Sequence, residues 1–253
     1  MRTVARVSTA AAVFVASLVP SLVQAQARPS AAEIVAKYVT AIGGEAEIRK
    51  VTSMKQLATM EVPSMGMSLS MEAYSAAPNK MSVKTTIPGM GEMLQGYNGT
   101  VGWDVNPMAG PRLLADKELQ QQVDNADFYA SMLYPADRFT SMETVGDTTV
   151  DGDKAYIVKM IRKSTGMESR SVFSAKTGLI VGSSSTIVAQ GGTIQVSQAV
   201  SDYKRFGGVL IATKMTQTMG PQTMLMSIQD VIINGAPESA FAVPEQVKPL
   251  IKP

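Results

Sequence analysis

A long stretch of period-two alternation, beginning at Ser53, is the feature that most constrains the fold of this chain. Met54, Ala58, Met60 and Val62 alternate with polar residues, and similar segments recur to about residue 233. Successive side chains of a β-strand point to opposite faces, so this period is typical of strands with one buried face. The pattern predicts about 11–12 short antiparallel strands.

Tight turns separate the predicted strands. Pro63-Ser64-Met65-Gly66 and Pro88-Gly89-Met90-Gly91 are two such turns, and Asn98-Gly99 is a strong hairpin signal because both residues accept a positive φ. Residues 106–115, rich in Pro and Gly, are expected to form a loop. The later strands are expected at residues 141–149, 153–163, 168–174, 179–189, 192–203, 209–219 and 222–233.

Helical spacing occurs in two places. Ser30 and Glu33 have the spacing of a capping box, and the apolar stripe that follows ends at Gly43-Gly44. A short second turn is expected over residues 45–50, and a longer helix from residue 116 to about residue 133. Both amphipathic helices must bury their apolar faces, and the concave side of a curled sheet is the expected place.

These elements predict a single α+β domain over residues 28–253, built on one large antiparallel sheet. A sheet of this many strands tends to curl on itself. The tail from Pro237 through Pro253 has no period and is expected to pack as an extended strap.

Residues 1–27 have the three parts of a cleavable secretory signal. Arg2 and Arg6 give a positive start, residues 9–19 form an apolar stretch, and small residues precede cleavage after Ala27 or after Ala25. The apolar stretch is too short to be a stable membrane anchor. The sequence therefore predicts an exported, periplasmic protein whose mature form has no integral membrane segment.

Charge and cysteine content narrow the possible partners. The chain has 23 basic and 21 acidic residues, and removing Arg2 and Arg6 with the signal leaves equal numbers of each. No run of Lys or Arg is present, so nothing favours binding to nucleic acid or to an anionic membrane surface. Cysteine is absent, so the core must be stable without disulfides.

The lack of both His and Cys limits the chemistry further. Without imidazole or thiolate, Ser-His-Asp and Cys-His nucleophiles are excluded, as are nearly all zinc, haem and iron–sulfur sites. The carboxylates that remain have no spacing that argues for acid–base catalysis, and they are interpreted as surface groups: Glu92, Asp104, Glu118, Asp124 and Asp127. We expect no catalytic residue, no metal, no cofactor and no enzyme activity.

Methionine is unusually frequent, with 18 residues. Many lie on one face of predicted strands or at turns: Met54, Met60, Met67, Met71, Met81 and Met215 on strands, and Met65, Met90 and Met108 at turns. Three interpretations remain open. The methionines could fill an ordinary core, form a deformable lining for a flexible ligand such as an acyl chain, or bind Cu(I) through their thioethers.

Several segments resemble a known group of proteins. These are Ala76-Ala77-Pro78-Asn79-Lys80-Met81, Ile87-Pro88-Gly89-Met90-Gly91, Gln95-Gly96-Tyr97-Asn98-Gly99-Thr100-Val101-Gly102-Trp103-Asp104-Val105-Asn106-Pro107 and Ser174-Ala175-Lys176-Thr177-Gly178-Leu179. Together with the opening helix they resemble the exported bacterial proteins grouped with the LolA-like outer-membrane lipoprotein-sorting proteins. The resemblance covers most of the chain after the signal, through turn and strand patterns.

The resemblance implies an incomplete antiparallel β-barrel with helices on its open side. In the carriers of that family the cavity holds the acyl chains of a lipoprotein in transit through the periplasm. We therefore expect a non-enzymatic carrier or binder of a lipid or lipidated protein, with a possible envelope protein partner. The alternative is an interaction or scaffold module with a solid core and no ligand.

A carrier of this kind would hold its cargo by desolvation, since each buried methylene contributes about 0.8 kcal/mol. The candidate cavity residues share the inward register of the first strand series. They are Met60, Met67, Leu69, Met71, Met81, Val83, Ile87, Tyr97, Val101 and Trp103.

Overall fold

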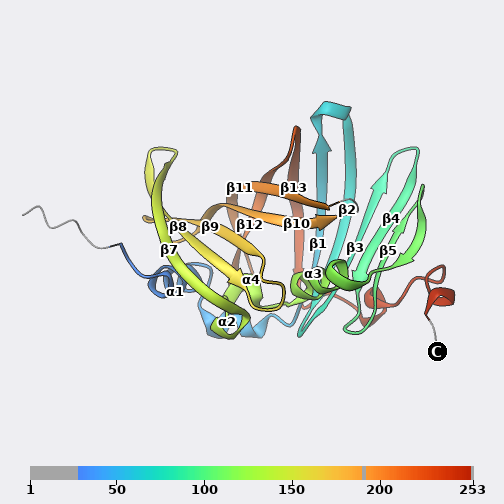
Figure 1. Ribbon diagram of the computed structural model, residues 1–253, viewed down its shortest axis with the longest axis horizontal. Helices are drawn as coiled ribbons and strands as arrows, with labels where there is room; N and C mark the ends of the chain where they lie inside the picture. Colours follow the sequence, from blue (N-terminus) through green and yellow to red (C-terminus); the bar gives the residue numbers. More distant parts are fainter. Residues whose placement is uncertain (1–27, 190–191, 252–253) are drawn as a thin grey trace, which may run out of the picture.

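A single open sheet of 13 strands dominates the computed structural model, which describes residues 28–189 and 192–251 (Figure 1). The strand order is β6-β5-β4-β3-β2-β1-β13-β12-β11-β10-β9-β8-β7, and every neighbouring pair is antiparallel. The two edge strands, β6 and β7, are not paired with each other, so the sheet is not closed. The predicted signal sequence, residues 1–27, lies outside the described residues.

Two series of hairpins build the sheet. The first contains β1 Ser53–Val62, β2 Met67–Ala76, β3 Lys80–Ile87, β4 Gly91–Tyr97, β5 Gly102–Asn106 and β6 Gly110–Leu113. The second contains β7 Phe139–Val150, β8 Asp153–Arg162, β9 Glu168–Ser174, β10 Ile180–Ala189, β11 Gly192–Phe206, β12 Val209–Met219 and β13 Gln222–Ile233. Pairing of β1 with β13, with Met54 opposite Ile233, joins the two series.

The 13 strands exceed the expected 11–12, and one of them, β6, is formed by residues 110–113 where a loop was expected. Asn106 and Gly110 are paired, so residues 107–109 are a hairpin turn within that region. Pro111 has no N–H to donate, and an edge strand tolerates it because one side needs no partner. The Pro and Gly content therefore indicated a turn and an edge strand together.

The first helix, α1 Ala31–Ala41, begins at the predicted capping box. The Glu33 backbone N–H donates to Ser30 Oγ at 3.3 Å, and the Ser30 backbone N–H donates to Glu33 Oε2 at 2.7 Å. Ile34, Val35 and Tyr38 are buried, so the predicted apolar stripe faces the core. The short second turn is the helix α2 Glu45–Lys50.

The helix expected over residues 116–133 is two helices, α3 Asp116–Ala126 and α4 Ala130–Leu133. Asp127 has an extended backbone, which ends α3. The break allows the Phe128 backbone N–H to donate to Pro78 O at 3.0 Å while the Phe128 ring is buried in the core. A continuous helix would keep that N–H within its own ladder.

The larger core cluster lies where α1 and α2 meet the second strand series. Tyr38 contacts Tyr134 and Phe173 edge-on, with ring centroids 5.8 and 5.7 Å apart. Val158 and Met160 of β8 complete the centre of this cluster and are almost fully buried. Aromatic pairs at these separations stabilise a core beyond the area they bury.

A smaller cluster lies on the first strand series. Trp103 is 1% exposed and packs with Val105 of the same strand and with Val247 of the C-terminal tail. The tail contains two 3₁₀ turns, Glu238–Phe241 and Lys248–Leu250, where an extended strap was expected. The tail packs against the sheet through Val247, and its two turns make it more compact than the expected extended strap. None of the helices in the described ranges has the length and apolarity needed to cross a lipid bilayer.

Candidate ligand-binding site

A cavity of about 590 Å³ lies between the sheet and residues of α1, α3 and α4. Its sheet wall comes from β1 and from β7 to β13. Much of the lining is apolar: Met54, Met160, Met215, Met226, Leu210 and Ile228. A volume of this size falls in the range of small-molecule binding pockets, ~300–1,000 Å³.

Cross-strand register places the methionines of this wall on one face. Met60 lies opposite Met226, Met226 opposite Met215, and Met215 opposite Val200. Residues directly opposite each other on antiparallel strands point to the same side of the sheet. This row crosses β1, β13, β12 and β11, and its last three members line the cavity.

One sector of the cavity is polar but carries no ionised side chain. Ser169, Ser171, Ser183 and Gln198 line it, and Ser183 Oγ donates to Gln198 Oε1 at 3.3 Å. Hydroxyl and amide groups of this kind orient a ligand through hydrogen bonds while apolar neighbours supply most of the contact area.

Three tyrosines of the wall are held neutral. Burial raises the pKa of Tyr38 and of Tyr134 above the ordinary value for a phenol. Burial likewise raises the pKa of Tyr203 to about 12, and its hydroxyl donates to Ile180 O at 2.9 Å. These rings therefore present uncharged surface to the cavity at neutral pH.

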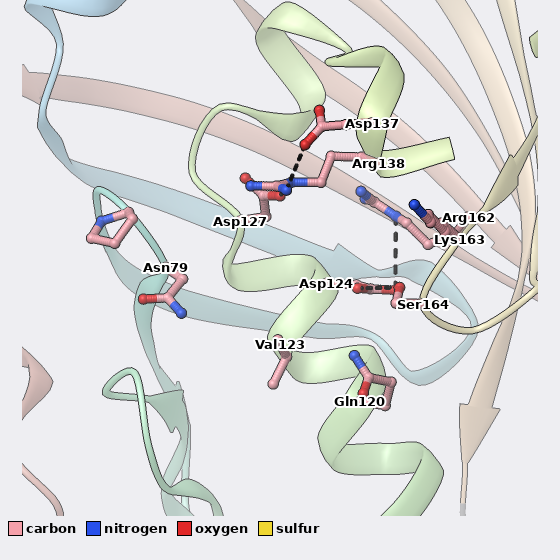
Figure 2. A pocket seen from close by; sticks show the side chains of 11 residues that line it. Asn79, Gln120, Val123, Asp124, Asp127, Asp137, Arg138, Arg162, Lys163 and Ser164 are labelled. Atoms are coloured by element: carbon pink, nitrogen blue, oxygen red, sulfur yellow. Dashed lines mark hydrogen bonds and ion pairs between the residues drawn. The ribbon is translucent and has the colours of Figure 1, made fainter. Parts of the chain in front are cut away.

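One end of the cavity is charged and adjoins a second pocket of about 400 Å³ (Figure 2). Asp124, Asp127 and Arg162 line both spaces. Arg162 Nε lies 3.7 Å from Asp124 Oδ2, and Arg138 Nε lies 2.6 Å from Asp127 Oδ2. The apolar cavity thus ends at a charged region, here called the mouth, where both signs of charge are present.

Ser164 and Lys163 occupy the far side of this mouth, on the turn between β8 and β9. Ser164 Oγ donates to both oxygens of the Asp124 carboxylate, at 2.6 and 2.7 Å. Figure 2 shows Lys163 beside Arg162 on the side of the pocket opposite Asn79. The mouth therefore contains the basic side chains of Arg162 and Lys163, together with carboxylates that already have hydrogen-bond or ion-pair partners.

Eight of the ten predicted cavity residues lie on the cavity side of the sheet, as the register shows. Tyr97 lies opposite Met81, Met81 opposite Ser75, and Ser75 opposite Met54, which lines the cavity. The same alternation places these residues on that face: Met60, Met67, Leu69, Met71, Val83 and Ile87. All eight except the buried Tyr97 are half-buried.

The other two predicted residues lie on the opposite face. Trp103 is opposite Gly96, and with Val101 it belongs to the cluster covered by the C-terminal tail. None of the ten lines the 590 Å³ cavity, which lies over the second strand series. The eight residues extend from the cavity across β1 to β4, and their role in binding stays a prediction.

Several cavity residues were not among those candidates. The sequence analysis named Met54 and Met215 only as methionines on strands. It did not single out Met160, Met226 or Tyr134. The sequence predicted strands at residues 209–219 and 222–233 but assigned no face to them. The pairing of β1 with β13, which sequence periodicity does not reveal, brings the second of these strands next to β1.

The carboxylates expected to be surface groups have basic or hydroxyl partners. Arg112 bridges Asp104 of β5 and Glu118 of α3, at 3.0 and 2.5 Å. Glu92 lies 3.7 Å from Lys84. Within the described ranges no three carboxylates gather as a metal site.

Comparison with solved structures identifies the fold. A LolA superfamily protein from Nitrosomonas europaea matches with a TM-score of 0.57 at 11% identity, over 85% of this chain and 99% of that one. A DUF1329 family protein from Desulfovibrio piger matches with a TM-score of 0.57 at 12% identity, over 84% and 97%. An outer-membrane lipoprotein-sorting protein domain from Vibrio parahaemolyticus matches with a TM-score of 0.51 at 11% identity, over 82% and 97%.

No protein-family model matches the sequence, and no curated protein does. Identities of 11–12% establish the fold and leave activity open. The open 13-stranded sheet, the two hairpin series joined through β1 and β13, and these three structures together give this chain a LolA-like fold.

Proposed function

We propose that this protein is a non-enzymatic carrier that binds a lipid, or the acyl chains of a lipidated protein, in the cavity between its sheet and its helices. The observation that carries the proposal is the 590 Å³ cavity with its methionine-rich wall. Thioether side chains are flexible and polarisable, so such a wall adapts to a flexible chain. A solved structure of similar fold is a lipoprotein-sorting domain, which supports the same class of ligand.

Binding would be driven by removal of apolar surface from water. Each methylene that enters the cavity contributes about 0.8 kcal/mol, so a long acyl chain is held without a charged contact. The half-buried face of β1 to β4 continues from the cavity and offers further apolar area to a longer chain. Met60, Met71 and Met81 are on this extension.

The charged mouth suits the polar end of such a ligand. Arg162 and Lys163 offer donors for an acidic or ester headgroup, and Asp124 and Asp127 offer acceptors for a hydroxyl or an ammonium group. A carrier with α1, α3 and α4 on the cavity side would use these helices as a cover that moves for loading and release.

The proposal also includes export of the domain to the periplasm. The expected signal in residues 1–27 would deliver residues 28–253, as a single domain, to the periplasm. There the domain would exchange its cargo with a membrane or with an envelope protein partner.

A matched pair of variants tests the cavity. Val200 lines it, and the neighbouring Ala199 is exposed on the other face of the same strand. Val200→Trp should fill the cavity and reduce the affinity for a fluorescent fatty acid about tenfold or more, whereas Ala199→Trp should bind like the wild type. Native mass spectrometry of protein purified from the envelope should show bound lipid. No bound lipid and no saturable uptake by the wild type would contradict the proposal.

A further inference from the structure

Four neighbouring hairpin tips share an unusual composition. Residues 63–66, 88–91, 107–110 and 219–222 each contain one Met, one Pro, at least one Gly and no charged residue. They connect β1 to β2, β3 to β4, β5 to β6 and β12 to β13. We call these four segments the methionine rim.

The tips lie along one end of the sheet. In Figure 1 the β1–β2 and β3–β4 hairpins project from the same side of the molecule. Residues 63–65 contact β13, and a Cβ placed on Gly91 would lie 3.7 Å from Pro107 Cβ. The four tips are therefore neighbours along the same end of the sheet.

Three of the four methionines of this rim are exposed, where apolar side chains are usually buried, and the fourth, Met219, is half-buried. Met65 is 61% exposed, Met90 44% and Met108 79%. Proline and glycine fix the turns that carry them, so the side chains project from short, stiff loops. The turns at the opposite end of the first series and between β11 and β12, residues 77–79, 98–101 and 207–208, contain no methionine.

The four tips themselves carry no charged residue, and charged residues lie behind the turns at both ends. Lys80 and Arg205 flank turns at the opposite end. Near the rim, Glu92 lies beside Lys84 and Glu61 lies on β1 behind the tip. An end with exposed thioethers and uncharged tips matches a surface that is apolar and neutral, because no charge has to be desolvated on contact.

We propose that the methionine rim docks the protein on the interfacial region of a lipid bilayer. Separate projecting tips fit a fluid interface, which closes around each side chain, better than a rigid protein surface, which would leave gaps between them. The inner face behind the rim carries Met60 and Met67 and leads to the cavity. Docking through the rim would therefore open the apolar face of the sheet toward the membrane.

The chemistry of the rim sets the lipid dependence. Since the tips carry no basic residue, binding should occur on vesicles of phosphatidylcholine alone and should change little with salt concentration. A requirement for anionic lipid, or loss of binding at high salt, would overturn the proposal.

Flotation with phosphatidylcholine vesicles tests the rim directly. The triple variant Met65→Gln, Met90→Gln, Met108→Gln should reduce vesicle binding about tenfold or more. The matched control Leu57→Gln, Val145→Gln, Ile232→Gln removes exposed apolar side chains outside the rim and should bind like the wild type. Equal binding by the two triple variants would contradict docking through the rim.

Tryptophan placed at the rim gives an independent readout. Met65→Trp and Met108→Trp should each be quenched by brominated phosphatidylcholine, while the native Trp103, which is 1% exposed, should not. No quenching at either site would overturn the proposal, as would wild-type protein that fails to float but captures an envelope protein through the rim. Fatty-acid uptake should stay unchanged in the Met→Gln triple variant, so a failure of the rim is distinguishable from a failure of the cavity.

Discussion

The ring of Trp103 on β5 occupies the space directly over Gly96, its partner residue on β4. A Cβ at residue 96 would lie 2.3 Å from Trp103 Cζ2 and 2.6 Å from Cε2. Such contacts are shorter than any real packing distance, so only glycine fits beneath this ring. The relationship explains how the largest side chain of the smaller core lies flat on the sheet.

Gly96→Ala should therefore destabilise the protein, by about 1–3 kcal/mol, because the buried ring has to shift. Chemical denaturation monitored by Trp103 fluorescence measures this change. Gly146→Ala is the matched control, since a Cβ there would find Ile157 Cδ1 at 3.9 Å as its nearest atom. The control should be neutral or slightly stabilising. Equal losses in both variants would contradict the packing argument.

Asn234 provides a second test, because it ties the end of β13 to the start of β1. Its Oδ1 accepts from the Thr52 backbone N–H at 2.8 Å, its Nδ2 donates to Lys50 O at 3.1 Å, and its φ is +56°. Asn234→Ala should cost about 2–4 kcal/mol in unfolding free energy, from lost hydrogen bonds and from strain.

Asn234→Gly separates these two contributions. Glycine adopts the positive φ without strain but restores no hydrogen bond, so its unfolding free energy should lie between those of the wild type and the alanine variant. If glycine is no more stable than alanine, backbone conformation contributes nothing at this position. Thermal and chemical unfolding of the three proteins decide the order.

The alkaline stability of the protein should depend on Tyr203. Because the folded-state pKa is raised to about 12 from the ordinary 10.0, the neutral phenol favours folding below pH 10. Above pH 10 the unfolded chain ionises first, so this contribution declines progressively until the pH passes about 12. Tyr203→Phe cannot ionise and should lose less stability between pH 9 and pH 11 than the wild type does. Equal losses of unfolding free energy in the wild type and in Tyr203→Phe over that pH range would contradict a contribution of the Tyr203 phenol.

At acid pH the relevant group is Glu72 on β2. Its oxygens lie 2.7 Å from Lys55 Nζ and 3.6 Å from Lys84 Nζ, and the hydrogen bond from Lys55 lowers the pKa of Glu72 below 4.5. This contribution is present above pH 4.5 and is lost as the pH falls through the folded-state value. Glu72→Gln should therefore narrow the stability difference between pH 6 and pH 3. If the variant loses as much unfolding free energy as the wild type between pH 6 and pH 3, other carboxylates determine the stability at acid pH.

Local patterns predicted the local elements well. The Ser30–Glu33 capping box, the period of two and the Asn98-Gly99 turn each depend on residues close in sequence, and each is present in the structure. Two of the departures, strand β6 and the break between α3 and α4, depend on tertiary partners. Asn106 pairs with Gly110, and Phe128 bonds to Pro78, 50 positions earlier in the sequence.

The candidate site was predictable in character but not in position. Alternating methionines predicted an apolar face on the first strand series, and Met60 shows why the cavity residues of the second series were not among the candidates. It belongs to the first strand series, yet the neighbour that connects it to the cavity is Met226 of β13. The pairing of strands so distant in sequence depends on how the whole sheet assembles, which no local period encodes.

The joint between β1 and β13 also has a kinetic consequence. Thr52 and Asn234 meet although they are 182 positions apart in sequence, so the two hairpin series can join only after nearly the whole chain is available. Contacts between residues so far apart in sequence form slowly. Until they form, β1 has a free edge that can pair with another chain. A chain that is synthesised from its amino-terminus therefore passes through a stage in which the first strand series is complete and β1 still lacks its neighbour β13.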